Sequence, residues 1–216
     1  MEQMKTGTTI LGIKCKDGVI LASDYRMTMG YLRAGKMKKI IPLTDKISAA
    51  VAGSVSEAQQ STRYLQAELR LNQLKLKREM QVREAANFAC SMLYSNIKYP
   101  TSYNFMYCAL LIAGYDLHGG HLFAAQPDGS IQECDYYICD GSGMEFALSI
   151  IEAEWKKDIT CAEAKHLAIK AVNAAISRDI ASGDAISVFQ FTKDGTKEVF
   201  YGQNDLEVKW FLNKNN

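Results

Sequence analysis

Histidine is scarce in this chain, neither sign of charge is in excess, and each of these absences excludes a class of protein. Only three of the 216 residues are histidines, and none of the six cysteines forms a Cys-x-x-Cys pair, so we expect no metal site and no cofactor. Lysine and arginine number 25 against 24 aspartates and glutamates, which gives no electrostatic reason to expect nucleic acid or an anionic membrane as a partner. No apolar run is long enough to span a bilayer.

Size and composition favour one large domain that follows a short N-terminal segment. Hydrophobic residues make up 48% of the sequence, which is enough for a single substantial core but leaves little room for two. Residues 1–7 lack the apolar stretch of a secretory signal, so they are either an ordinary loose terminus or a leader to be removed. Several cysteines lie within apolar runs, which indicates reduced, buried thiols of a cytoplasmic protein.

The hydrophobic periodicity changes five times along the chain. Period-two or continuous apolar runs bounded by turn signals predict strands at 10–15, 19–23, 39–42, 47–52, 106–115, 122–125, 130–134, 136–140, 185–192 and 198–201. Period-3.6 patterns predict helices from Ser54 to about Leu76 and at 82–97, 144–155, 161–180 and 205–212. Ser54 and Glu57 have the spacing of a capping box at the first of these helices.

This order of elements predicts a layered α+β architecture. Strands come first, then two helices, strands again, two more helices and a final hairpin. Consecutive hairpins favour antiparallel sheets, and two helix pairs need two apolar surfaces to cover. The economical packing is a four-layer α/β/β/α sandwich of two antiparallel sheets flanked by helix pairs.

The sequence Gly7-Thr8-Thr9, directly before the first expected strand, suggests a specific chemistry. If the Gly7–Thr8 bond is cut, Thr8 carries a hydroxyl and a free amine on one residue, which is a nucleophile with a built-in base. Most Gly-Thr pairs only mark the beginning of a strand, so this interpretation depends on the other polar residues.

Further polar residues stand where a plain core does not need them. Asp24 ends the second expected strand, and Lys39 begins an apolar one. Gly141-Ser142-Gly143 is a tight loop before a helix, and residues 178–184 connect the fourth helix to a strand. Taken singly, each has an ordinary explanation: a strand end, surface charge, a helix start or a helix end.

Together these residues form an ordered set that resembles the β-type subunits of the 20S proteasome, most closely those of archaea. The resemblance covers essentially the whole chain after the leader. Its specific points are Gly7-Thr8-Thr9, Lys16-Asp17-Gly18-Val19, Asp24-Tyr25-Arg26, Thr28-Met29-Gly30, Lys38-Lys39-Ile40, Ala52-Gly53-Ser54, Gly141-Ser142-Gly143, Arg178-Asp179 and Ala181-Ser182-Gly183-Asp184. The family has the N-terminal-nucleophile hydrolase fold, which agrees with the four-layer sandwich.

The resemblance implies a threonine endopeptidase and a role for each matching residue. Residues 1–7 are removed by autolysis at Gly7–Thr8, and residues 8–216 form the peptidase domain. Thr8 is the nucleophile, and Asp24 and Lys39 complete its catalytic group. The residues expected to surround the new amino terminus are Ser142, Asp179 and Ser182. The backbone N–H of Gly53 is expected to stabilise the oxyanion.

Two routes for the proton of the Thr8 hydroxyl are open. A terminal amine has an ordinary pKa of about 7.7–8.0, and a cationic Lys39 kept charged by Asp24 favours its neutral form, which can accept the proton directly or through a water. In the alternative, Lys39 itself is the acceptor. In both, Gly53 lets the backbone approach the scissile carbonyl closely.

The resemblance also locates a first substrate pocket, whose side chains are all uncharged. They are Met27, Thr28, Met37, Ile41, Val51 and Val55. An apolar pocket favours cleavage after hydrophobic residues, although such residues in strands are more often ordinary core.

The family implies a particular set of partners. β subunits form seven-membered rings of one or more kinds, two such rings stack, α-subunit rings cap them, and an ATP-driven unfoldase delivers unfolded polypeptide. Two alternatives remain: a non-catalytic ring subunit, which usually lacks the threonine or its lysine, and another N-terminal-nucleophile hydrolase, such as the simpler bacterial two-ring protease or a small-molecule amidase.

Overall fold

The computed structural model describes residues 7–30, 32–98 and 108–202. The helix expected at 205–212, residues 1–6 of the leader and the first two residues of the strand expected at 106–115 lie outside these ranges.

The first of two five-stranded antiparallel sheets contains the first and the last strand of the described residues. Its order is β10-β1-β2-β11-β12. These strands are β1 (Ile10–Cys15), β2 (Gly18–Asp24), β10 (Tyr137–Asp140), β11 (Ile186–Thr192) and β12 (Gly195–Gly202). Strand β2 lies at the centre of the sheet and is buried along its whole length, which explains why its sequence is continuously apolar rather than alternating.

The second sheet has the order β5-β6-β7-β8-β9. Its strands are β5 (Ile40–Pro42), β6 (Ile47–Gly53), β7 (Cys108–Asp116), β8 (Gly119–Ala125) and β9 (Ile131–Glu133). Every pairing in this sheet is antiparallel as well.

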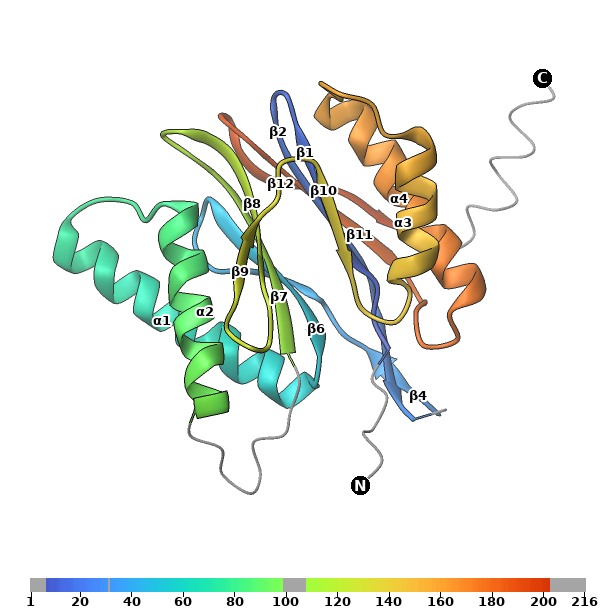
Figure 1. Ribbon diagram of the computed structural model, residues 1–216, viewed down its shortest axis with the longest axis horizontal. Helices are drawn as coiled ribbons and strands as arrows, with labels where there is room; N and C mark the ends of the chain where they lie inside the picture. The colour runs from blue at the N-terminus through green and yellow to red at the C-terminus, as the bar shows by residue number, and fades with distance from the viewer. Residues whose placement is uncertain (1–6, 31, 99–107, 203–216) are drawn as a thin grey trace.

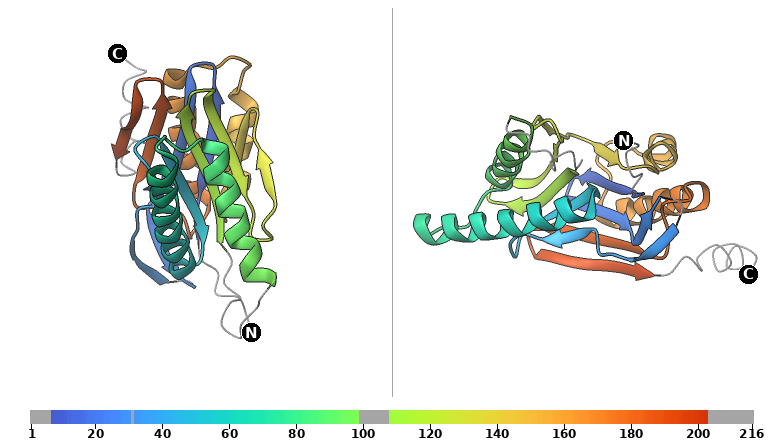
Figure 2. Two further views of the ribbon diagram at one scale, coloured as in Figure 1. Left: turned by 90° about the vertical axis from the view of Figure 1, so that its left-hand side faces the viewer. Right: turned by 90° about the horizontal axis from the view of Figure 1, so that it is seen from below.

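The two sheets face each other between two helix pairs, as Figures 1 and 2 show. Helices α1 (Val55–Leu76) and α2 (Val82–Lys98) cover the second sheet, and α3 (Met144–Glu154) and α4 (Cys161–Arg178) cover the first. A third buried cluster fills the space between the sheets. The four-layer α/β/β/α sandwich expected from the sequence is therefore confirmed.

Small residues and a helix cap let α4 lie close to its sheet. Ala164, Ala168, Ala171 and Ala175 recur at helical spacing and are buried. Its N-cap is Thr160, whose hydroxyl accepts a hydrogen bond from the Glu163 amide while the Glu163 carboxylate accepts from the Thr160 amide.

The prediction of a capping box at Ser54 and Glu57 is wrong. Ser54 is the N-cap of α1, but its side chain makes no capping hydrogen bond. Its hydroxyl instead lies 3.0 Å from that of Ser56, so the right spacing of residue types did not produce the expected geometry.

A hairpin that the sequence patterns do not predict projects from the sandwich. Strands β3 (Arg26–Met29) and β4 (Leu32–Lys36) pair with each other only, with a bulge between Met27 and Thr28. Strand β4 is largely exposed. The hairpin connects Asp24 at the end of β2 to Lys39 just before β5, and it brings Thr28 beside Gly7.

The six cysteines are all free thiols, four of them buried. Among the described helices none combines the length and the apolar character needed to cross a membrane.

Candidate active site

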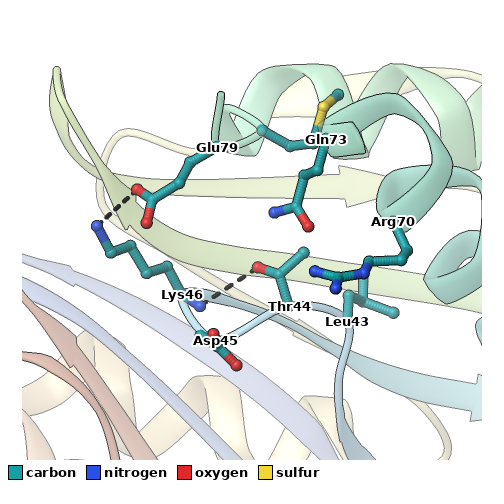
Figure 3. A pocket seen from close by; sticks show the side chains of 8 residues that line it. Leu43, Thr44, Asp45, Lys46, Arg70, Gln73 and Glu79 are labelled. Atoms are coloured by element: carbon teal, nitrogen blue, oxygen red, sulfur yellow. Dashed lines mark hydrogen bonds and ion pairs between the residues drawn. The ribbon is translucent and has the colours of Figure 1, made fainter. Parts of the chain in front are cut away.

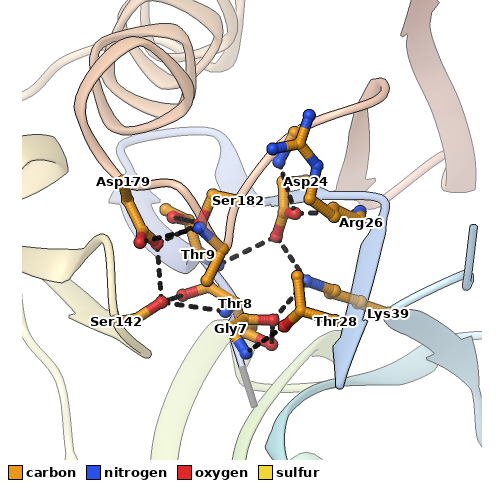
Figure 4. Close-up of polar contacts among 12 residues, drawn as sticks. Gly7, Thr8, Thr9, Asp24, Arg26, Thr28, Lys39, Ser142, Asp179 and Ser182 are labelled. Atoms are coloured by element: carbon orange, nitrogen blue, oxygen red, sulfur yellow. Dashed lines mark hydrogen bonds and ion pairs between the residues drawn. The ribbon is translucent and has the colours of Figure 1, made fainter. Parts of the chain in front are cut away.

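Residues from widely separated segments meet around Thr8 at one end of the sheets (Figure 4). Thr8 precedes β1, and Asp24 is the last residue of β2. Lys39 lies just before β5, and Ser142 lies just before α3. Asp179 and Ser182 come from the loop between α4 and β11. The structure thus brings together six residues that the family resemblance selected.

A buried ion pair lies at the centre of this group. The Lys39 Nζ is 2.6 Å from Asp24 Oδ1, and the two side chains are 1% and 0% exposed. Asp24 also accepts three backbone hydrogen bonds, from the N–H groups of Thr9 at 2.9 Å, Arg26 at 3.0 Å and Gly183 at 2.9 Å. Such full satisfaction is what keeps a charged carboxylate tolerable in the interior.

Burial has the dominant effect on Lys39. It lowers the pKa of the ammonium below its usual value, although the charge of Asp24 and its hydrogen bond act in the opposite direction. Asp24 thus favours the charged form of Lys39, as expected from the sequence, while burial opposes it. The neutral amine is easier to reach here than in an exposed lysine, which makes Lys39 a more capable proton acceptor.

The peptide bond between Gly7 and Thr8 lies inside this group. The Gly7 carbonyl oxygen accepts hydrogen bonds from Lys39 Nζ at 3.2 Å and from the Thr8 hydroxyl at 2.6 Å. On the other side, the Gly7 N–H donates to the Thr28 hydroxyl at 2.9 Å. This carbonyl is thus held beside the hydroxyl of the next residue and faces the Lys39 ammonium, which polarises it.

A second hydrogen-bond network holds the Thr8 backbone. The Thr8 N–H donates to Ser142 Oγ at 3.1 Å. The hydroxyls of Ser142 and Ser182 both donate to Asp179 Oδ2, at 2.6 and 2.7 Å. Because Ser142 and Ser182 lie on different loops, Asp179 connects the two loops that flank the amide of Thr8.

A small hollow adjoins Thr8 and Lys39. Its lining includes Gly53, at the end of β6, with the left-handed φ of 117° that favours glycine. Met27, Thr28, Met37 and Val55, four of the six residues expected in the substrate pocket, also line it.

Ile41 and Val51 lie elsewhere. Val51 is 1% exposed and belongs to the core between the second sheet and helices α1 and α2, and Ile41 packs against the same core. Side chains alternate along a strand, so Val51 points to the helix side while its neighbours Ala50 and Ala52 face the other sheet. The structure therefore does not place these two side chains in the lining.

Three further residues belong to the group although no role was carried over to them. The Thr9 hydroxyl is 2.7 Å from Ser182 Oγ. Arg26 donates to the Ile180 carbonyl at 2.9 Å and pairs with Asp184 at 3.5 Å, which fixes the loop that contains Asp179 and Ser182. All three stand within the motifs Gly7-Thr8-Thr9, Asp24-Tyr25-Arg26 and Ala181-Ser182-Gly183-Asp184, and this membership was their sequence signal.

A larger hollow lies elsewhere, between the β5–β6 turn and the end of α1 (Figure 3). It is lined by Leu43, Thr44, Asp45, Lys46, Arg70, Gln73, Glu79 and Met80. None of the expected site residues is among them, and two of the lining residues, Lys46 and Glu79, form an ion pair.

Two antiparallel sheets between helix pairs, with the start of β1 buried against a lysine–aspartate pair, define an N-terminal-nucleophile hydrolase sandwich. Residues 4–190 match the family model described as proteasome subunit. The chain is 38% identical to a proteasome subunit beta of Methanococcus maripaludis, over all of this chain and 94% of that protein. It is 40% identical to a proteasome subunit beta of Nanoarchaeum equitans, over 89% and 97% of the two chains, and 38% identical to proteasome subunit beta 1 of Pyrococcus furiosus, over 92% and 98%. The chain therefore belongs to the proteasome subunit family, as a β-type subunit.

Proposed function

We propose that this β-type subunit is an active threonine endopeptidase, with Thr8 as its nucleophile once residues 1–7 have been removed. The observation that carries the proposal is the buried Lys39–Asp24 pair, whose Nζ lies 3.2 Å from the carbonyl oxygen of the bond to be cut. A subunit with a purely architectural role has no need for a buried ion pair at that carbonyl.

Removal of the leader needs only groups that surround the Gly7–Thr8 bond. The Thr8 oxygen attacks the Gly7 carbonyl carbon as its proton passes to the neutral amine of Lys39, and the ammonium so formed stabilises the negative charge that develops on the carbonyl oxygen. The C–N bond then breaks, the Thr8 nitrogen takes up a proton and leaves as an amine, and an ester joins Gly7 to the Thr8 oxygen. Water hydrolyses this ester, which yields the Gly7 carboxylate and a free Thr8 with both hydroxyl and amine.

The same groups serve a polypeptide substrate. The freed Thr8 hydroxyl attacks the scissile carbonyl, with the Gly53 N–H as the oxyanion donor, an interaction typically worth roughly 10²–10³ in rate. Asp179, Ser142 and Ser182 hold the new amino terminus. We propose Lys39 as the acceptor of the hydroxyl proton, because burial lowers the pKa of its ammonium and makes the neutral amine more populated than in an exposed lysine.

Activity is expected to rise with pH through a pKa below the ordinary lysine value of about 10.4, because the neutral amine of Lys39 becomes populated. Between the lowered pKa and the ordinary one the unfolded chain binds more protons than the folded chain, so the free energy of unfolding should rise with pH there too. Lys39→Arg, which keeps the charge but cannot lose its proton, should abolish the activity. If a folded Lys39→Arg protein retains the parent pH profile, the terminal amine is the base and Lys39 is not.

Hydrophobic residues are expected at the position before the cut. Fluorogenic peptides ending in Tyr or Leu should give kcat/KM values at least about tenfold above those ending in Arg or Glu. Met27, Met37 and Val55 give the lining an apolar surface, and its two cations, Arg26 and Lys39, are already paired with Asp184 and Asp24. Met37→Ala should reduce this ratio, whereas the matched change Ile41→Val, in a side chain outside the lining, should leave it unchanged. A preference for Arg or Glu would refute the assignment of this hollow.

For the assembly we propose seven-membered β rings, of one or more kinds, stacked in pairs and capped by α-subunit rings in the cytoplasm, with an ATP-driven unfoldase supplying unfolded polypeptide. Intact mass after co-expression with an α partner tests the activation step. Loss of residues 1–7 supports it, and a full-length chain with full activity contradicts it. A non-catalytic ring subunit is the remaining alternative within this family.

A further inference from the structure

A second cluster of reactive side chains lies at the far end of β1. Cys15 is the last residue of β1, Asp17 is in the following turn and Cys161 is the first residue of α4. Their Sγ and carboxylate oxygen atoms all lie within 4.8 Å of one another. Seven residues of extended chain at about 3.3 Å each place this cluster roughly 20 Å from Thr8, so it takes no part in the proposed peptidase chemistry.

Backbone contacts hold the cluster in place. Asp17 Oδ1 accepts the N–H of Cys161 at 2.8 Å across 144 positions of sequence, and the Lys16 N–H donates to the Ile159 carbonyl at 3.0 Å. A Cβ at Gly18 would lie 2.1 Å from the Phe191 carbonyl oxygen and 3.1 Å from Cys161 Sγ, so the glycine permits the close approach of β11 and leaves the thiol its space. The turn and the start of α4 are thus docked independently of any ligand.

The charges around the cluster are those that attract a cation. The Asp17 carboxylate is part of the cluster, whereas the nearby Glu163 carboxylate is already paired with Lys156 at 2.6 Å. A soft dication replaces both thiol protons and offsets the Asp17 charge. Cys161 is buried, Cys15 is half-buried and Asp17 is exposed, so a metal could enter from the Asp17 side.

We propose that Cys15, Asp17 and Cys161 form a binding site for a soft divalent transition metal of the zinc class. Two thiolates and one carboxylate are typical zinc ligands, and the exposed side leaves a fourth tetrahedral position for water. Binding converts two thiols to thiolates and releases two protons per ion. The metal then joins the end of β1, the β1–β2 turn and the start of α4.

Cobalt(II) added to the full-length protein, reduced with a phosphine that does not bind metal, tests this site. We expect one ion per subunit with a thiolate-to-cobalt charge-transfer absorption, tighter binding as pH rises, and displacement by zinc. Cys15→Ser and Cys161→Ser should abolish the absorption. Asp17→Asn, which retains an oxygen for the Cys161 N–H, should weaken binding at least about tenfold, since even indirect partners of a metal typically contribute 10–100-fold. Cys90→Ser and Cys108→Ser, in the other half of the sandwich, are the matched controls and should bind as the parent does.

A measurement on the parent protein alone keeps the test independent of how the variants fold. Zinc should protect Cys15 from alkylation, while Cys139, which is half-buried as well, should react at the same rate with and without the metal. The proposal is overturned if no thiolate absorption forms, if the absorption survives in both serine variants, or if zinc leaves the alkylation of Cys15 unchanged.

Discussion

The Thr8→Ala protein is expected to keep residues 1–7 attached and to lose peptidase activity by at least about 10⁴-fold, because removal of a catalytic nucleophile usually has effects of this size or larger. Two reactions fail together, since the same hydroxyl is needed to cut the leader and to attack a substrate. Intact mass and hydrolysis of a fluorogenic peptide, measured on the assembled particle, follow the two reactions separately.

This substitution should change the free energy of unfolding only slightly. The Thr8 hydroxyl donates one hydrogen bond, to the adjacent Gly7 carbonyl, so the loss in free energy of unfolding should be about 1 kcal/mol. Thr8→Ser, which keeps a hydroxyl and can gain the amine, is the matched control and should retain both reactions at a lower rate. If the parent is no more active than an assembled Thr8→Ala particle, this subunit has a structural role only.

Asp24→Ala is expected to destabilise the protein far more than Lys39→Met, although both should abolish activity. Without Asp24, a buried ammonium loses its counter-charge, which alone typically costs about 3–5 kcal/mol. The N–H groups of Thr9, Arg26 and Gly183 also lose their acceptor, each at about 1–3 kcal/mol if it stays buried without a partner. Without Lys39, the carboxylate keeps these three donors, so the damage should be smaller.

Denaturant titration of the two variants measures this asymmetry. Lys38→Met, one residue away on an exposed side chain that lies over the Phe189 ring, is the matched control. It should change the free energy of unfolding by no more than about 1 kcal/mol and leave the activity intact. Equal destabilisation by Asp24→Ala and Lys39→Met would mean that the backbone donors do not hold the carboxylate as described.

Local pattern was enough to predict most of the elements but not the β3–β4 hairpin. Strands such as β2 and β7 are buried, so their sequences are continuous apolar runs, and these runs predict them. Strand β4 is largely exposed, so its sequence, Leu32–Lys36, has neither alternation nor an apolar run. It is a strand because it pairs with β3, and the hydrophobic periodicity of a sequence does not reveal such a pairing.

The site likewise has a part that the sequence predicted and a part that depends on the fold. The family motif selected Thr8, Asp24 and Lys39, and the fold brings them together. The direction of the Val51 side chain depends on the register of β6 within the sheet, which a sequence position alone does not fix. The meeting of Cys15 with Cys161 depends on where α4 docks, so spacing rules written for neighbouring cysteines had no means of finding it.

The Gly7–Thr8 bond is surrounded by groups from the ends of β2, the start of β5 and the loops that flank α3 and α4. These segments converge only when both sheets and the second helix pair have docked. Under the proposed mechanism a half-folded or misfolded subunit therefore cannot cleave its Gly7–Thr8 bond and cannot free the Thr8 amine. Under that mechanism the leader is removed only once folding is complete, so the activation step itself selects correctly folded subunits.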